Sequence, residues 1–553
     1  MRVLSYILII LLQTLSLFSQ ENDKSKLKLD YNGSLSVGSV INHSFTDQPN
    51  QLRNSYFIAG NFNMSVNGFR VPASLYFNNR TIGLQRSTIF LGIKPTIRKT
   101  KIHLGFSSMN FSKYFLNGST FIGAGIESEW RGITVSAMSG RLKNILPDAP
   151  NLNTTGLEFL QEYNRSVHAL KVGYKSGNSY AELIGFYGQD LFNTIEDPVP
   201  TERNVDFLPK ENLGIGLNSR IALFKKVRLG IQTILSAFTE DAEAEAITLN
   251  TGRLSFLTNI FQPNLTTYLS YAATADLTFT HNNNNLGIVV ERVSPEFRTI
   301  GTYFYYADFV NYTISLDSKI GRKVTLNGNF GYQKNNLSDR SIFKNQRRIF
   351  SLNLRYVPDE RFNISSRVTN YNLDKSPELQ VENDSIRVVS IQSSAQVIPS
   401  YSFGRDKRFS LRAIANYRLA ENRFSLQDEE SSTAIWLTKL FLNGRLSNYQ
   451  LRVGVGYSKF QLEDFPRSTI TSDINVSTTL FDRKASVQLG SSYNVVEVIG
   501  KSNGYFFRSN ANFNYSITSR LRFNMGLYHF YRQANVGQNN SDLRVQTRMS
   551  FAL

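Results

Sequence analysis

The strongest constraint on the fold of this chain is an alternation of apolar and polar residues with a period of two. It is clearest between Asp542 and Leu553. Successive side chains of a β-strand point to opposite faces, so this segment predicts a strand that lies between an apolar and a polar environment. One face carries Leu543, Val545, Thr547, Met549, Phe551 and Leu553, and the other carries Asp542, Arg544, Gln546, Arg548 and Ser550.

The same alternation recurs upstream, in segments such as 350–356, 451–457, 510–517 and 521–527. The polar face consists of Asn, Ser, Gly, Gln and Arg, which can line water but cannot fill a dry core. Two-faced strands in such number are typical of a transmembrane β-barrel, in which the apolar face meets lipid. We therefore expect an all-β protein, a large single-chain antiparallel barrel in the cell outer membrane.

Composition excludes several other classes of protein. Mean hydropathy is −0.26, too low for a bundle of transmembrane helices, whereas a barrel wall dilutes its apolar residues with polar ones. The chain has no Cys, which excludes disulfides, thiolate metal sites and thiol catalysis. The formal net charge is +18, but the basic residues are scattered along the predicted strands and turns. Nucleic acid is therefore not expected as a partner.

The N-terminus has the pattern of a secretory signal. Arg2 precedes an apolar run over residues 3–18, and the small residue Ser19 ends it. This predicts a signal peptide over residues 1–19 and an outer-membrane β-barrel over residues 20–553. Because the first alternating segment follows at once, we expect neither a plug domain nor a periplasmic domain. An uncleaved anchor helix is the alternative.

Short and long connections alternate between the predicted strands. The short ones are rich in Gly, Asn, Asp, Lys and Arg, which suit tight hairpins, and they include 131–132, 176–178, 321–323, 443–445 and 482–484. Longer links fall near residues 143–165, 190–211 and 240–263. Short periplasmic turns and longer external loops are the rule in barrels. The count of connections predicts roughly 26 strands, within a range of about 22–28.

The sequence contains no recognisable catalytic or metal-binding motif. The His residues, at positions 43, 103, 168, 281 and 529, are far apart, and no P-loop, HExxH or GxSxG motif occurs. We therefore predict a protein that is not an enzyme and that uses no cofactor or metal. A lipid-modifying enzyme with a Ser/His site is the minor alternative, since a barrel brings distant strands together. The acidic cluster within 240–245 indicates a solvated loop tip, with divalent cations as the alternative.

A group of arginines falls on the predicted polar face near the C-terminal end: Arg452, Arg508, Arg522, Arg544 and Arg548. Neighbouring predicted strands present few inward carboxylates. We hypothesise that these arginines give the lumen a positive field that favours anionic solutes or an acidic partner segment. The alternative is that they brace the wall by pairing with loop carboxylates that fold inward.

Two segments carry a family resemblance. Residues 109–127, which contain MNFSKYFLNG and FIGAGIE, and residues 292–304, which contain RVSPEFR and GTYF, resemble segments of poorly characterised Bacteroidota outer-membrane β-barrel proteins. The end of the signal, Phe18-Ser19-Gln20, is similar to signals of that phylum. The resemblance implies a Gram-negative outer-membrane barrel, and it supplies no catalytic residues.

The first of these segments also suggests a local role. Residues 109–118 lie between two predicted strands and mix Phe, Tyr and Gly, a composition that suits a loop folded inward and packed. An external loop tip is the alternative. The candidates for a constriction or docking element are Met109, Phe111, Tyr114, Phe115 and Gly118.

These observations favour one function over two others. A wall of roughly 26 strands encloses a lumen wider than that of porins, so loops or another protein must occlude it. We expect a loop-constricted transport channel for solutes. The alternative is a non-enzymatic scaffold or export partner for a surface or secreted protein, of the type IX secretion or gliding type. Expected partners are outer-membrane lipids, lipopolysaccharide and the barrel assembly machinery. The residues predicted to close the barrel are Val545, Met549, Phe551 and Leu553.

Overall fold

The computed structural model describes most of the chain. The described residues are 29–45, 54–66, 69–78, 90–142, 164–191, 208–247, 261–302, 307–377, 387–424, 429–462, 466–535 and 539–552. The predicted signal peptide and Leu553 lie outside them. No helix among these residues is long and apolar enough to cross a membrane.

The described residues form strands that follow one another along the chain. The N-terminal strands are β1 (Leu29–Ser44), β2 (Ser55–Val66), β3 (Phe69–Asn78), β4 (Phe90–Ile93), β5 (Thr96–Ile97), β6 (Thr100–Asn110), β7 (Asn117–Trp130), β8 (Ile133–Leu142) and β9 (Arg165–Ser176). The middle strands are β10 (Ser179–Asp190), β11 (Glu211–Leu223), β12 (Val227–Thr239), β13 (Thr267–His281), β14 (Asn284–Val293), β15 (Phe309–Ile320), β16 (Val324–Asn335), β17 (Phe343–Tyr356) and β18 (Phe362–Pro377). The C-terminal strands are β19 (Val388–Phe403), β20 (Phe409–Phe424), β21 (Glu429–Leu446), β22 (Tyr449–Leu462), β23 (Arg467–Leu480), β24 (Ala485–Val498), β25 (Lys501–Ser516), β26 (Leu521–Gln533) and β27 (Asn540–Ala552). A short 3-10 helix, η5 (Arg405–Lys407), lies in one turn.

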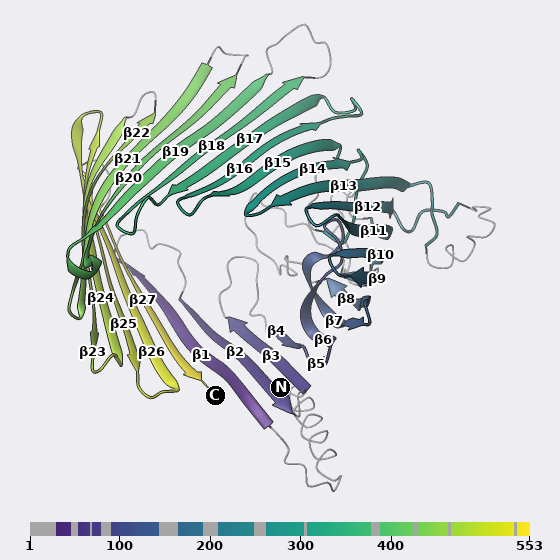
Figure 1. Ribbon diagram of the computed structural model, residues 1–553, viewed down its shortest axis with the longest axis horizontal. Coiled ribbons are helices and arrows are strands. Elements are labelled where there is room, and N and C mark those ends of the chain that lie inside the picture. The colour runs from purple at the N-terminus through teal and green to yellow at the C-terminus, as the bar shows by residue number, and fades with distance from the viewer. Residues whose placement is uncertain are drawn as a thin grey trace.

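The strands form one closed antiparallel barrel, which Figure 1 shows as a ring of neighbouring strands from purple to yellow. Apart from the short β4 and β5, each strand pairs with the next in sequence, and β27 pairs with β1. The short segments β4 and β5 share one position in the wall, because both lie between β3 and β6. The wall therefore has 26 strand positions, and the predicted fold class and strand count are confirmed.

The terminal strand closes the barrel in a regular register. Phe551 lies opposite Leu35, Met549 opposite Val37 and Val545 opposite Ile41. These side chains share one face, while the lumen face of the same pair is polar. On that face the Ser36 and Ser550 hydroxyls lie 3.0 Å apart, and Arg548 donates a hydrogen bond of 3.0 Å to Ser36. The alternation read from the sequence therefore separates two faces of one wall.

The outer face of the wall is an apolar belt. Ile288, Ile314 and Phe330 form one row across β14, β15 and β16, and each side chain is more than 40% exposed. Trp130 and Trp436 are also exposed, at 64% and 52%. Apolar side chains exposed in a continuous belt on a closed barrel require lipid around them. The protein is therefore an integral protein of the outer membrane.

Short turns join the strands at the end where β1 begins and β27 ends. Residues with positive φ make the tight reversals, for example Arg131 and Gly132 between β7 and β8, at φ 49° and 88°. One predicted turn was wrong in position: residues 443–445 belong to β21, and the reversal falls at Ser447, where φ is 51°. The other end carries the longer connections, so the short turns are periplasmic and the long loops external.

The two-faced wall predicts a large difference between neighbouring substitutions on β15. Ile314 faces lipid, whereas Thr313 faces the lumen opposite Gly331. We expect Ile314→Arg to destabilise the folded barrel by about 2–4 kcal/mol, because the charge must enter the hydrocarbon. Thr313→Arg, the matched control, should change the free energy of unfolding by less than about 1 kcal/mol. Urea unfolding in lipid vesicles measures both, and equal losses would contradict the assignment of the faces.

Candidate functional site

The lumen wall between β6 and β14 is covered by an inner layer of two loops. The first inward loop, residues 111–116, connects β6 to β7, and the second inward loop, residues 294–302, follows β14. Both lie in the segments that carry the family resemblance. Side chains from these loops and from the wall form one buried apolar cluster. The candidate constriction residues Met109, Phe111, Tyr114 and Phe115 belong to it, each at most 3% exposed.

Phe115 anchors the first inward loop to the wall. Its ring stacks on Phe186 of β10, with 4.8 Å between the ring centroids. It also lies against Gly214 of β11, where a Cβ atom would overlap the ring. Gly214 thus leaves room for an aromatic side chain from a loop far away in the sequence. Burial of such a ring stabilises the docked loop by roughly 1.5–3 kcal/mol.

Polar contacts fix the same loop at a second point. The Tyr114 hydroxyl donates a hydrogen bond of 3.1 Å to Glu291 on β14 and also contacts the Thr274 hydroxyl on β13. Lys113 Nζ forms an ion pair of 2.6 Å with Glu291 Oε1. Glu291 is 7% exposed, and a buried carboxylate requires such partners. The apolar and polar anchors together hold this loop in one position.

The second inward loop docks on both the wall and the first loop. The backbone N–H of Leu116 donates to the carbonyl of Gly301 at 3.2 Å, and Phe297 contacts the Tyr114 ring edge to face. Ser236 on β12 donates to the carbonyl of Arg298 at 2.9 Å. The Arg298 side chain forms an ion pair with Glu240, one of the acidic residues predicted to lie at a solvated loop tip. The two resembling segments therefore meet in space.

Gly118, the remaining constriction candidate, lies at the start of β7 with φ 70°, and a Cβ there would meet open space. It donates its backbone N–H to the carbonyl of Leu116 at 3.0 Å. Its contribution is the positive φ that turns the chain from the loop into the wall.

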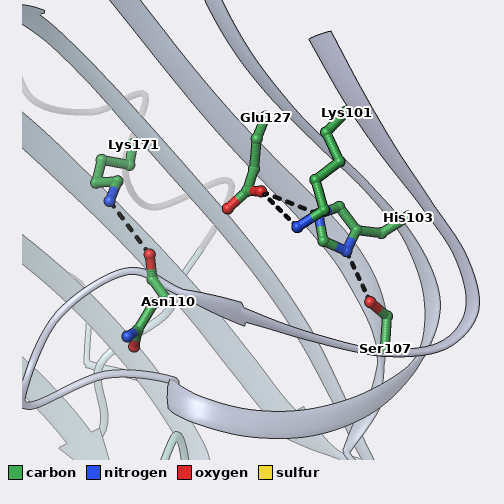
Figure 2. A network of polar contacts seen from close by, with 6 residues as sticks. All are labelled: Lys101, His103, Ser107, Asn110, Glu127 and Lys171. Carbon is green, nitrogen blue, oxygen red and sulfur yellow. Dashed lines mark hydrogen bonds and ion pairs between the residues drawn. The ribbon is translucent and has the colours of Figure 1, made fainter. Parts of the chain in front are cut away.

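A buried His and a buried Ser lie together with a partly exposed Glu on β6 and β7 (Figure 2). His103 Nδ1 lies 2.7 Å from the Ser107 hydroxyl, and His103 Nε2 lies 3.1 Å from Glu127 Oε2, which also pairs with Lys101 at 3.4 Å. Such a trio resembles a nucleophile, base and orienting acid in composition. However, Ser107 is 2% exposed and His103 1% exposed, so a substrate carbonyl has no access to the hydroxyl. The trio fits a structural role in the wall.

Lys171 of β9 contacts the last residue of β6, next to the first inward loop. Its Nζ donates to the backbone carbonyl of Asn110 at 3.2 Å, as Figure 2 shows.

Among the residues that the structure describes, no group of three or more His, Asp or Glu could hold a metal ion.

The predicted lumen arginines all lie on the polar face but do not form one cluster. Arg508 and Arg544 line one recess, where Arg508 also stacks on Phe506 at 5.0 Å. Arg522 and Arg548 lie on the adjacent strands β26 and β27, one register step apart diagonally. Arg452 lies in a separate recess and donates from Nε to Asn443 Oδ1 at 2.8 Å. With the described carboxylates, none of these side chains forms an ion pair. The bracing alternative therefore has no support in the described part of the chain.

Sequence reasoning missed two parts of this lumen. It did not pair the first inward loop with the second, because the residues in contact, Leu116 and Gly301, are far apart along the chain. It also left out Arg408, Arg412 and Arg445, which line the same recess as Arg452. The alternation could have found Arg412, since it falls on the polar face of its strand.

The closed wall, the apolar belt and the polar lumen with its inner layer define a large integral outer-membrane β-barrel. No protein-family model and no curated protein matches the chain.

Several solved structures share the barrel architecture. The P pilus usher PapC translocation pore matches at 11% identity over 95% of this chain and 99% of that chain, with a TM-score of 0.43. Pseudomonas aeruginosa OpdK, solved with vanillate, matches at 10% identity over 63% and 94%, with a TM-score of 0.30. Pseudomonas aeruginosa OccK9 matches at 13% identity over 70% and 98%, also with a TM-score of 0.30.

Proposed function

We propose that this protein is an outer-membrane transport channel whose lumen is narrowed by the two inward loops. The observation that carries the proposal is the inner layer itself. Tyr114 and Phe115 have no exposed surface, so the first inward loop is part of the packed structure. A barrel of 26 strand positions would be wider than porins of 16 to 18 strands if nothing covered its wall. An inner layer that is packed against the wall reduces the width of the lumen without a separate plug domain.

The other side of the lumen supports passage of water-soluble molecules. Strands β18 to β20 present Thr369, Gln392, Gln396 and Asn416 around one recess. Hydroxyl and amide side chains of this kind hydrate a pathway and exchange hydrogen bonds with a passing solute. A lipid-modifying enzyme receives no support from the trio of His103, Ser107 and Glu127, because the Ser107 hydroxyl and the His103 ring are buried.

Channel recording of the purified full-length protein tests this proposal. We expect stepwise ion conductance in planar bilayers, because the lumen retains a continuous polar wall on one side. Mass spectrometry of the same preparation identifies proteins that co-purify with it. A barrel that leaves bilayers insulating and that co-purifies with a large secreted or surface protein would instead favour the scaffold or export function.

A further inference from the structure

The charge of the lumen differs between its two sides. On the side of the inner layer, three cations pair with carboxylates: Lys113 with Glu291, Arg165 with Asp190 at 2.9 Å, and Lys101 with Glu127. On the lumen face of β17 to β27, the described carboxylates are Asp473 and Asp542, and Asp473 pairs with Lys439 at 3.6 Å. The arginines on that face are Arg347, Arg355, Arg367, Arg412, Arg418, Arg445, Arg452, Arg467, Arg508, Arg522, Arg532, Arg544 and Arg548. The uncovered side of the lumen therefore carries a large excess of positive charge.

The densest part of this excess is a recess near the periplasmic end, which we call the arginine recess. It is lined by Arg408, Arg412, Arg445 and Arg452, which come from β20, β21, β22 and the turn before β20. Arg408 has a distant exposed partner in Asp406, at 3.9 Å, and such a pair stabilises little. Like charges gathered on one concave surface repel one another and attract anions strongly.

Between the arginines lie neutral donors. Asn443 lies opposite both Arg452 and Ser410 on the neighbouring strands, and Asn475 lies opposite Arg452 on the other side. Gln488 and Ser400 complete the lining. Guanidinium groups match carboxylates and phosphates with two parallel hydrogen bonds, whereas amides and hydroxyls match sugar hydroxyls. The recess thus combines the groups that an anionic, hydroxyl-rich molecule needs.

We propose that the arginine recess is a binding site for acidic carbohydrate, that is, for a sugar chain that carries carboxylate groups. This deepens the proposed channel function by naming its solute class. A simple inorganic anion would use the arginines but not the row of amides and hydroxyls across β19 to β24. A neutral sugar would leave the guanidinium charges without a counter-charge.

Equilibrium binding to the full-length protein in detergent tests the site without requiring an open pore. The probes are trigalacturonate, maltotriose and inorganic phosphate, measured by calorimetry. We expect trigalacturonate to bind at least about tenfold more tightly than the other two, because it alone offers carboxylates to the guanidinium groups and hydroxyls to the amides. The Arg412→Gln/Arg452→Gln double variant should weaken trigalacturonate binding by about tenfold or more.

Arg322→Gln provides the control, since Arg322 lies in the short turn between β15 and β16, outside the recess. It removes charge from the barrel and should leave binding unchanged. Equal affinity for phosphate and trigalacturonate would overturn the carbohydrate assignment, and so would a double variant that binds like the wild-type protein.

The channel proposal fails separately from this one. If bilayers stay insulating but trigalacturonate binds and the double variant does not, the site stands and transport is wrong. If the protein conducts but no acidic sugar binds or blocks the current, the channel stands and the site is wrong.

Discussion

Replacing Gly214 with valine should release the first inward loop from the wall and raise single-channel conductance by roughly twofold or more. A Cβ at Gly214 would overlap the Phe115 ring, which is fully buried and stacked on Phe186. Valine suits a β-strand, so the wall of β11 is retained while the loop is displaced. The loss of the buried Phe115 contacts should also lower the free energy of unfolding by about 3 kcal/mol. Channel recording and urea unfolding measure the two effects.

The matched control is Gly185→Val on the adjacent strand β10. A Cβ there meets only the Leu170 carbonyl, at 4.0 Å, so we expect conductance and stability close to those of the wild-type protein. Phe115→Ala should reproduce the higher conductance in a protein that retains Gly214. Gly214→Val and Phe115→Ala remove the same contact, so their effects should not add. The Gly214→Val/Phe115→Ala double variant should therefore lose less free energy of unfolding than the sum of the two single losses. Unchanged conductance in Gly214→Val would show that the inner layer does not limit the pore.

The alternation in the sequence was sufficient to predict the wall. Phe551, Met549 and Val545 share a face in the structure as they do in the printed pattern, because a strand of any origin alternates its side chains. The position of one turn was less predictable. Gly444 indicated a turn in the sequence, but it lies inside β21, where the Phe409 ring packs 3.1 Å from the place of a Cβ. Glycine serves close packing as well as turns, and one sequence does not separate the two.

The site was predicted only in part, for a physical reason. The composition of residues 109–118 indicated a packing loop, but the partners of that loop are Phe186, Gly214 and Glu291, which become neighbours only when the barrel closes. A local pattern contains no information about which distant strand supplies the matching space. For the inward arginines, the alternation predicted the face of the wall on which each side chain lies. It could not predict which residues are its neighbours on the adjacent strands. The resemblance to Bacteroidota barrels, the signal peptide and the lipid and assembly partners stay predictions.

Because β27 pairs with β1, we expect that an introduced disulfide can link the two strands that close the barrel. The chain has no Cys, so two introduced cysteines are the only thiols in it. Val37 and Met549 lie directly opposite across the β1 and β27 pair and share the outer face. Antiparallel partners have Cα atoms about 4.5–5.5 Å apart, within the range that a disulfide accepts. We therefore expect Val37→Cys/Met549→Cys to form a disulfide on oxidation, and the barrel to keep a cyclic, faster-migrating form after boiling in detergent.

The control pair separates register from proximity. Ser550 is next to Met549 in sequence but faces the lumen, opposite Ser36. Val37→Cys/Ser550→Cys therefore places two thiols on opposite sides of the sheet, and boiling should give the linear form with or without oxidant, because Cβ vectors that point apart cannot be bridged. A register slip of one residue would exchange the behaviour of the two cysteine pairs. Migration on the gel therefore reports the register between β1 and β27. If neither pair cross-links in the folded protein, β1 and β27 are not neighbours, and the wall is an open sheet whose lumen and belt must be assigned anew.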